Sequence, residues 1–177
     1  MSDFFGVMGL PRSAWLDGEE LKERFHRLSA ERHPDAPGGS GAAFSGLNEA
    51  WQTLREPVSR LRHFLELTAP ESLAASGGAP SELGDLFMDI ATLKQLAGAM
   101  EKPASPLARA LLEPRRLALL DRLSGVEARL SAAVETGHGE IQSPAATAAE
   151  LAATLGRLTF LSHWGRQMRE LRLELSS

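Results

Sequence analysis

The tripeptide His33-Pro34-Asp35 places two ionisable side chains on either side of a proline, and the chemistry it suggests is recognition. Pro34 lacks a backbone N–H and disfavours helical backbone at the residue before it, so a preceding helix must end there. An aspartate on such a turn can accept charge-assisted hydrogen bonds from an arginine of a partner protein. The alternative is structural: Pro34 ends the helix and Asp35 closes an Asx-type turn. Amphipathic helical patterns on both sides favour the recognition role.

No other group of residues has the spacing of a catalytic or metal site. The five histidines are scattered, none has a second histidine three or four residues later, and no nucleophile elbow is evident. The lack of cysteine excludes disulfides, thiolate catalysis and cysteine-ligated zinc or iron–sulfur centres in this chain. We therefore expect no catalytic residues, no metal ligands and no cofactor, in a protein that is not an enzyme.

The composition is typical of a soluble globular protein. Apolar residues make up 43% and charged residues 24% of the chain. The formal net charge of -4 provides no general positive field for a nucleic acid. No apolar run approaches the roughly 20 residues of a membrane-spanning helix, and the first residues do not resemble a signal peptide. We expect a cytoplasmic protein whose partners include neither nucleic acid nor membrane.

Nearly every apolar pattern has helical spacing, which predicts an all-α fold. In the N-terminal part we expect a short helix over residues 3–9 and a second helix from Asp17 to about Arg32. A third helix is expected over residues 42–55 and a fourth from Pro57, since proline suits the first turn of a helix. These helices must hold the tripeptide at the junction between the second and the third.

A change of composition divides the chain. Residues 68–79 are rich in Pro, Ser, Gly and Ala and have little to bury, so we expect a linker there between domains at 1–67 and 80–177. The second domain contains three longer helical patterns, separated by prolines, whose leucines recur at three- and four-residue steps. Such seams predict a bundle of three antiparallel helices.

One face of the second helix is basic. At 100° per residue, Lys22 and His26 share a face with His33, beside the stripe that we expect to be buried. Arg24 and Arg27 lie further round the helix. Glutamates four residues before each arginine leave open an ordinary solvated face with i, i+4 ion pairs. For Lys22 and His26 we favour a docking role.

With these helices around it, the tripeptide resembles the signature of the J-domain, which is His-Pro-Asp between its second and third helices. The resemblance implies an N-terminal J-domain helical hairpin that docks on a DnaK/HscA-type chaperone and stimulates its ATPase. The residues that it assigns to chaperone binding are His33, Pro34, Asp35, Lys22, His26 and Arg27.

Further segments look like HscB, the J-type co-chaperone of iron–sulfur cluster biogenesis, over almost the whole chain. They are Gly9-Leu10-Pro11, residues 47–55, Pro57 followed by Arg60 and Leu65, and residues 158–161. This resemblance implies that the C-terminal three-helix bundle holds an IscU-type iron–sulfur scaffold protein as client. The client-binding surface that it implies comprises Phe87, Met88, Ala91, Thr92, Gln95 and Phe160.

The spacing agrees with that surface, because Phe87 and Met88 fall outside the expected seam, and large apolar residues outside a core often mark a partner site. A wide buried stripe or packing against the J-domain is the alternative. The family's helix carries several acidic residues where this one has Thr92, Gln95 and Ala99. A J-domain protein with a different client, and a helical interaction protein with a degenerate J-domain, therefore remain as alternative functions.

Overall fold

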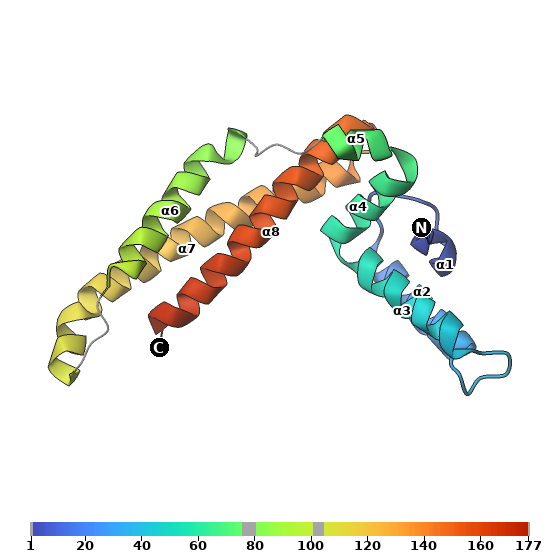
Figure 1. The fold of residues 1–177 in the computed structure, drawn as a ribbon, viewed down its shortest axis with the longest axis horizontal. Coiled ribbons are helices and arrows are strands. Elements are labelled where there is room, and N and C mark those ends of the chain that lie inside the picture. The colour runs from blue at the N-terminus through green and yellow to red at the C-terminus, as the bar shows by residue number, and fades with distance from the viewer. Residues whose placement is uncertain (1, 76–80, 101–104, 177) are drawn as a thin grey trace. The chain divides into compact units, whose positions relative to one another are not determined.

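Every regular element is a helix in the ranges that the computed structural model describes, residues 2–75, 81–100 and 105–176 (Figure 1). The all-α fold predicted from the apolar spacing is confirmed. None of the helices in these ranges has both the length and the apolar character required to cross a membrane.

The chain divides into two compact units, and the division does not simply follow the sequence. The end of one long helix and the start of the next group with the N-terminal segment. The domain boundaries expected at 1–67, 68–79 and 80–177 stay a prediction. The first unit comprises Met1–Gly77 with His138–Leu155, and the second comprises Gly78–Gly137 with Gly156–Ser177.

The helices of the N-terminal segment begin where their capping residues predict. The Asp17 carboxylate accepts hydrogen bonds from the backbone N–H groups of Glu19 and Glu20 at 3.0 and 2.9 Å. The Ser40 hydroxyl accepts one from Ala43 N–H at 3.2 Å. The four expected helices are confirmed as α1 (Phe4–Met8), α2 (Gly18–Arg32), α3 (Gly41–Arg55) and α4 (Pro57–Thr68).

The core of the first unit lies where α1 and α2 pack against α3. α2 and α3 run side by side (Figure 1). Phe25 of α2 stacks on Trp51 of α3 with ring centroids 4.7 Å apart. Each large buried side chain stabilises the fold by roughly 1.5–3 kcal/mol. The buried residues of this core are Phe5, Met8, Leu21, Leu47, Ala50 and Leu54.

α1 is too short to be stable alone, and two side chains from other helices hold its ends. The Phe4 N–H donates to His63 Nε2 at 3.1 Å, and the His63 ring is buried against the aromatic residues of α1. At the other end, the Arg24 guanidinium donates to the carbonyl oxygens of Met8 at 2.9 Å and Gly9 at 2.7 Å. These bonds satisfy backbone groups that a helix end leaves unpaired.

Arg60 is a buried arginine whose partners are backbone carbonyls. Only 6% of the residue is exposed. Its Nε donates to the Ala14 carbonyl oxygen at 3.1 Å, and its Nη1 donates to that of Leu54 at 2.9 Å. Burial lowers the pKa of Arg60. The side chain therefore joins the loop before α2 to the end of α3.

Part of the expected linker is helical. Residues 70–75 form α5 (Pro70–Ala75), because proline suits the first turn and alanine and leucine favour helix. Ala69 in front of it is buried. Composition alone missed this helix, which is too short to show a periodic pattern. Residues 76–80, which include the end of the expected linker, lie outside the described residues.

The second unit contains three helices that run alongside one another (Figure 1). They are α6 (Gly84–Gly98), which follows the 3-10 turn Ser81–Leu83, and parts of α7 (Pro106–Gln142) and α8 (Ala148–Ser176). α7 continues through Pro114. The predicted seam is buried, which confirms the helical bundle: Leu86, Ile90, Leu93, Leu119, Leu123, Val126, Leu130, Leu158, Leu161 and Met168.

Polar side chains also join these helices. Arg172 Nε of α8 donates to the Glu127 carboxylate of α7 at 3.1 Å. Lys94 Nζ of α6 donates to Gln167 Oε1 of α8 at 3.1 Å. Because each bond joins two helices, the bonds favour one register of the packed apolar seam.

We expect the substitution Arg60→Met to lower the free energy of unfolding by about 2 kcal/mol, because it leaves buried carbonyl oxygens of Ala14 and Leu54 without a donor. Chemical denaturation followed by tryptophan fluorescence measures the change. Arg62→Met is the matched control, since Arg62 lies exposed on the same helix. Equal stability of the two variants would contradict the structural role of Arg60.

Candidate functional site

His33-Pro34-Asp35 forms a closed turn directly after α2. The helix ends at Arg32, and His33 has extended backbone with φ -56° and ψ 140°. The Asp35 N–H donates to His33 Nδ1 at 3.3 Å, and the Ala36 N–H donates to the His33 carbonyl oxygen at 2.8 Å. Pro34 needs no such partner because it has no N–H. The position predicted for this turn, between α2 and α3, is confirmed.

The two ionisable side chains of the turn are accessible. The Asp35 side chain is 91% exposed and that of His33 is 50% exposed. Asp35 Oδ2 lies 3.5 Å from His33 Nδ1. Among the described residues, no arginine or lysine pairs with the Asp35 carboxylate. The carboxylate is therefore free to accept hydrogen bonds from a donor outside the chain.

Two glycines fold the following loop onto the end of α2. Gly38 has φ 81°, which favours glycine, and the Gly39 N–H donates to the Ala36 carbonyl oxygen at 2.9 Å. A Cβ on Gly39 would lie 1.9 Å from the His33 carbonyl oxygen, so no other residue fits there without a shift of backbone. The composition of residues 36–41 indicates a loop. Only the structure shows that the backbone of Gly39 lies close to the His33 carbonyl.

A ring contact supports the turn from α3. Phe44 meets the His33 imidazole edge to face, with ring centroids 5.4 Å apart. Phe44 is partly buried and stands on the first turns of α3. No local pattern in the sequence connects Phe44 with His33, because the two residues are eleven positions apart on either side of the loop.

Three basic residues of α2 are exposed, and a fourth, Arg24, binds another helix. Lys22, His26 and Arg27 are exposed, as expected of a docking face. Lys22 lies 3.6 Å from Glu19, while Arg27 has no hydrogen-bond or ion-pair partner among the described residues. Arg24 instead binds the carbonyls at the end of α1, so the i, i+4 ion pair considered for it is replaced by a capping role.

A second candidate surface lies on the bundle. Phe87 and Met88 of α6 are 52% and 61% exposed. The ring centroids of Phe87 and Phe160 each lie 5.9 Å from that of Trp164, which is buried. We call these four residues the aromatic patch. Trp164 was not expected on this surface, although its i, i+4 spacing from Phe160 places both residues on one face of α8.

The other residues expected on this surface are also accessible. Ala91, Thr92 and Gln95 are exposed on α6. Phe160 is half-buried, because it packs against Trp164. The structure thus brings the six sequence-predicted residues to accessible positions on α6 and α8.

In the described ranges, no three His, Asp or Glu side chains come close enough together to hold a metal ion. The accessible groups at the two surfaces are the Asp35 carboxylate, the cations of α2, and the apolar side chains of Phe87 and Met88.

The N-terminal segment defines a class of protein. Residues 3–63 match the family model of the DnaJ domain. The DnaJ chaperone of Nostoc punctiforme is 33% identical over 107 residues, and that of Trichormus variabilis is 33% identical over 92 residues. These matches cover 57% and 50% of this chain, but it spans about a quarter of the relatives' length, 28% and 23%. The N-terminal segment of this chain is therefore similar to the DnaJ domain.

The fold of the full chain is more specific than that class. HscB from Vibrio cholerae has a TM-score of 0.60 at 21% identity, covering 98% of this chain and 99% of that one. The human co-chaperone HscB has a TM-score of 0.52 at 18% identity, covering 98% of this chain and 84% of that one. The chain therefore has a fold similar to that of these HscB proteins, as the sequence resemblance implied.

We expect Gly39→Ala to open the turn, because its Cβ would push the His33 carbonyl away from the Ala36 N–H. Loss of that bond, worth roughly 1 kcal/mol, would make the Ala36 amide exchange with solvent about fivefold faster. Hydrogen exchange followed by NMR measures the rate. Gly41→Ala is the control, since its Cβ meets nothing within 4 Å. Unchanged exchange in Gly39→Ala would show that the turn is not held in this way.

Proposed function

We propose that this protein is a co-chaperone that stimulates the ATPase of a DnaK/HscA-type chaperone through its J-domain. The observation that carries the proposal is the Asp35 carboxylate, which is 91% exposed and fixed beside His33 on a turn that Pro34 keeps out of the helix. A carboxylate in this position presents acceptor oxygens at little entropic cost, because the backbone that carries it is already ordered.

The chemistry of docking follows from the charges. An arginine of the chaperone would donate two hydrogen bonds to the Asp35 carboxylate. Lys22, His26 and Arg27 on α2 would face acidic groups of the same partner and would speed association more than they add affinity. The protein supplies no catalytic group in this proposal: it biases the chaperone toward the state that hydrolyses ATP.

The second part of the proposal is client delivery. The aromatic patch would bind the client through the exposed Phe87 and Met88 and the half-buried Phe160, with the buried Trp164 supporting the two phenylalanine rings, because aromatic and methionine side chains form the centres of many protein interfaces. Since HscB proteins share this fold, we propose an IscU-type iron–sulfur scaffold protein as the client. The expected cytoplasmic location stays a prediction.

Two alternatives to this proposal differ in the client and in the activity of the J-domain. A different client is favoured by the uncharged residues Thr92, Gln95 and Ala99, which stand where the resemblance implies acidic ones. A helical interaction protein with a degenerate J-domain would have the same fold but would give no ATPase stimulation. The assays below separate these alternatives.

We expect Asp35→Asn and His33→Gln each to reduce ATPase stimulation more than tenfold with the helical content unchanged, because a lost charge-assisted hydrogen bond costs about 1.5–3 kcal/mol. Steady-state ATP hydrolysis by the DnaK/HscA-type chaperone of the same organism measures the effect. Asp121→Asn, an exposed aspartate of α7, is the control. Full stimulation by Asp35→Asn would refute the role of the turn, and no stimulation by the wild-type chain would favour the degenerate J-domain.

We expect Phe87→Ala and Phe160→Ala each to weaken binding of an IscU-type scaffold protein about tenfold or more, since central aromatic residues contribute most to such interfaces. Titration calorimetry measures the dissociation constant, and circular dichroism monitors the helices. Leu111→Ala removes a leucine that is 72% exposed on α7 and serves as the control. Equal binding by all three variants would exclude the aromatic patch as the client surface.

A further inference from the structure

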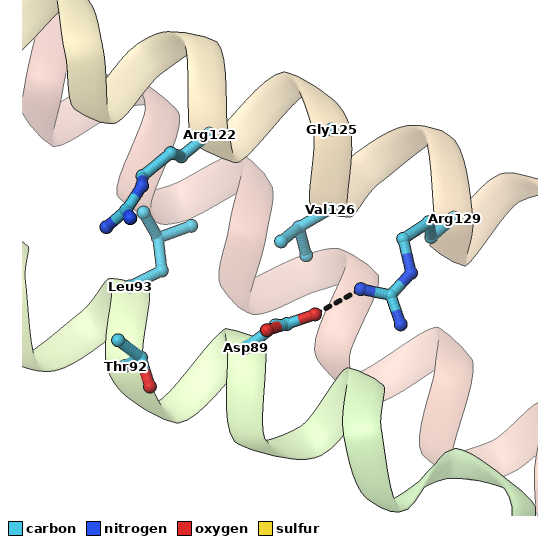
Figure 2. Close-up of a pocket in the computed structure, with 7 residues that line it drawn as sticks. All are labelled: Asp89, Thr92, Leu93, Arg122, Gly125, Val126 and Arg129. Carbon is cyan, nitrogen blue, oxygen red and sulfur yellow. Dashed lines mark hydrogen bonds and ion pairs between the residues drawn. The ribbon is translucent and has the colours of Figure 1, made fainter.

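A groove of 310 Å³ lies between α6 and α7 (Figure 2). Its floor is apolar, because Leu93 of α6 and Val126 of α7 line it and both are buried. Thr92 and Arg122 stand at one end and Asp89 at the other. Gly125 widens the α7 side, where a Cβ would meet no atom within 4 Å.

Among the described residues, some charged groups of the groove are paired within the chain and one is not. Asp89 forms an ion pair with Arg129 across the two helices, which neutralises the one carboxylate that lines the groove (Figure 2). Figure 2 shows the Arg122 side chain extending from α7 toward α6 beside Leu93. In the part of the chain that the structure describes, neither Arg122 nor the Thr92 hydroxyl has a hydrogen-bond partner. The groove therefore holds one uncompensated positive charge.

These groups match the chemistry of an acidic side chain. A guanidinium binds a carboxylate through two parallel N–H···O bonds, and a threonine hydroxyl can donate a third. The apolar floor of Leu93 and Val126 suits the methylene groups that carry such a carboxylate. A basic side chain would meet Arg122 as a like charge and is disfavoured.

Of the aromatic patch, Met88 adjoins the groove, whereas Phe87 lies on the other flank of α6, against Trp164 of α8. Thr92 lies four residues after Met88, so the two side chains are neighbours on the helix surface. A protein that covers Met88 would therefore reach the mouth of the groove. We infer that the groove binds an aspartate or glutamate side chain of the client protein that docks on the aromatic patch, and that Arg122 selects clients with an acidic group there. This inference rests on the proposed client-binding function.

The test uses the full-length chain and an IscU-type scaffold protein of the same organism as probe. Calorimetric titration should show roughly tenfold weaker binding for Arg122→Ala and a larger loss for Arg122→Glu, with Arg122→Lys in between. Raising the salt from about 50 to about 300 mM should narrow the difference, because ions screen an exposed charge. Arg169→Ala, an exposed arginine of α8 outside the groove, should bind as the wild type does.

The outcomes separate the two proposals. If Phe87→Ala weakens scaffold binding and Arg122→Ala and Arg122→Glu do not, the aromatic patch is the client surface and the role of the groove is wrong. Free glutarate could bind the wild type but not Arg122→Ala, while both bind the scaffold protein with the same dissociation constant. In that case the ligand of the groove is a small carboxylate and the inference is overturned. If the wild-type chain does not bind the scaffold at all, the client proposal and this inference both fail.

Discussion

Pro34 constrains the chain at the end of α2, because its ring disfavours helical backbone at His33 and its nitrogen has no hydrogen to donate. α2 ends at Arg32, and the chain reverses before α3 begins at Gly41. The reversal lays α2 against α3, so that Leu21 and Leu47 enter one core. It also leaves an aspartate on a tight turn with an exposed carboxylate. One covalent feature thus sets both the packing of the hairpin and the exposure of its recognition group.

Burial and the availability of a partner decide what each arginine does. Arg60 is enclosed and bonds two carbonyl oxygens, and Arg24 caps the end of α1, so both stabilise the first unit. Arg27 and Arg122 are exposed and have no partner among the described residues. The same guanidinium therefore completes the backbone hydrogen bonding in the interior and remains available for recognition at the surface.

In the proposed interface the bundle would combine two kinds of recognition, one on α6 and one on α7. Phe87 and Met88 offer apolar area, which supplies affinity without much direction. Arg122, across the groove from Thr92, offers a directed charge, which distinguishes one partner from another. An interface that uses both can reject a protein of suitable shape that lacks a carboxylate at the right place. The J-domain would then determine the chaperone, and the bundle would determine the client.

The sequence by itself determined the all-α fold, the four N-terminal helices and the place of His33-Pro34-Asp35, because helical periodicity, caps and proline act over a few residues. It also placed Phe87 and Met88 outside the buried seam. It missed α5, which is too short for a period, and Trp164 as a member of the aromatic patch. Only the tertiary structure decided that Arg24 caps α1 and that Phe44 supports His33. It also decided that Asp89 forms its ion pair with Arg129. Such contacts join residues far apart in the chain or depend on a turn's three-dimensional path, and no local pattern specifies which side chains will meet.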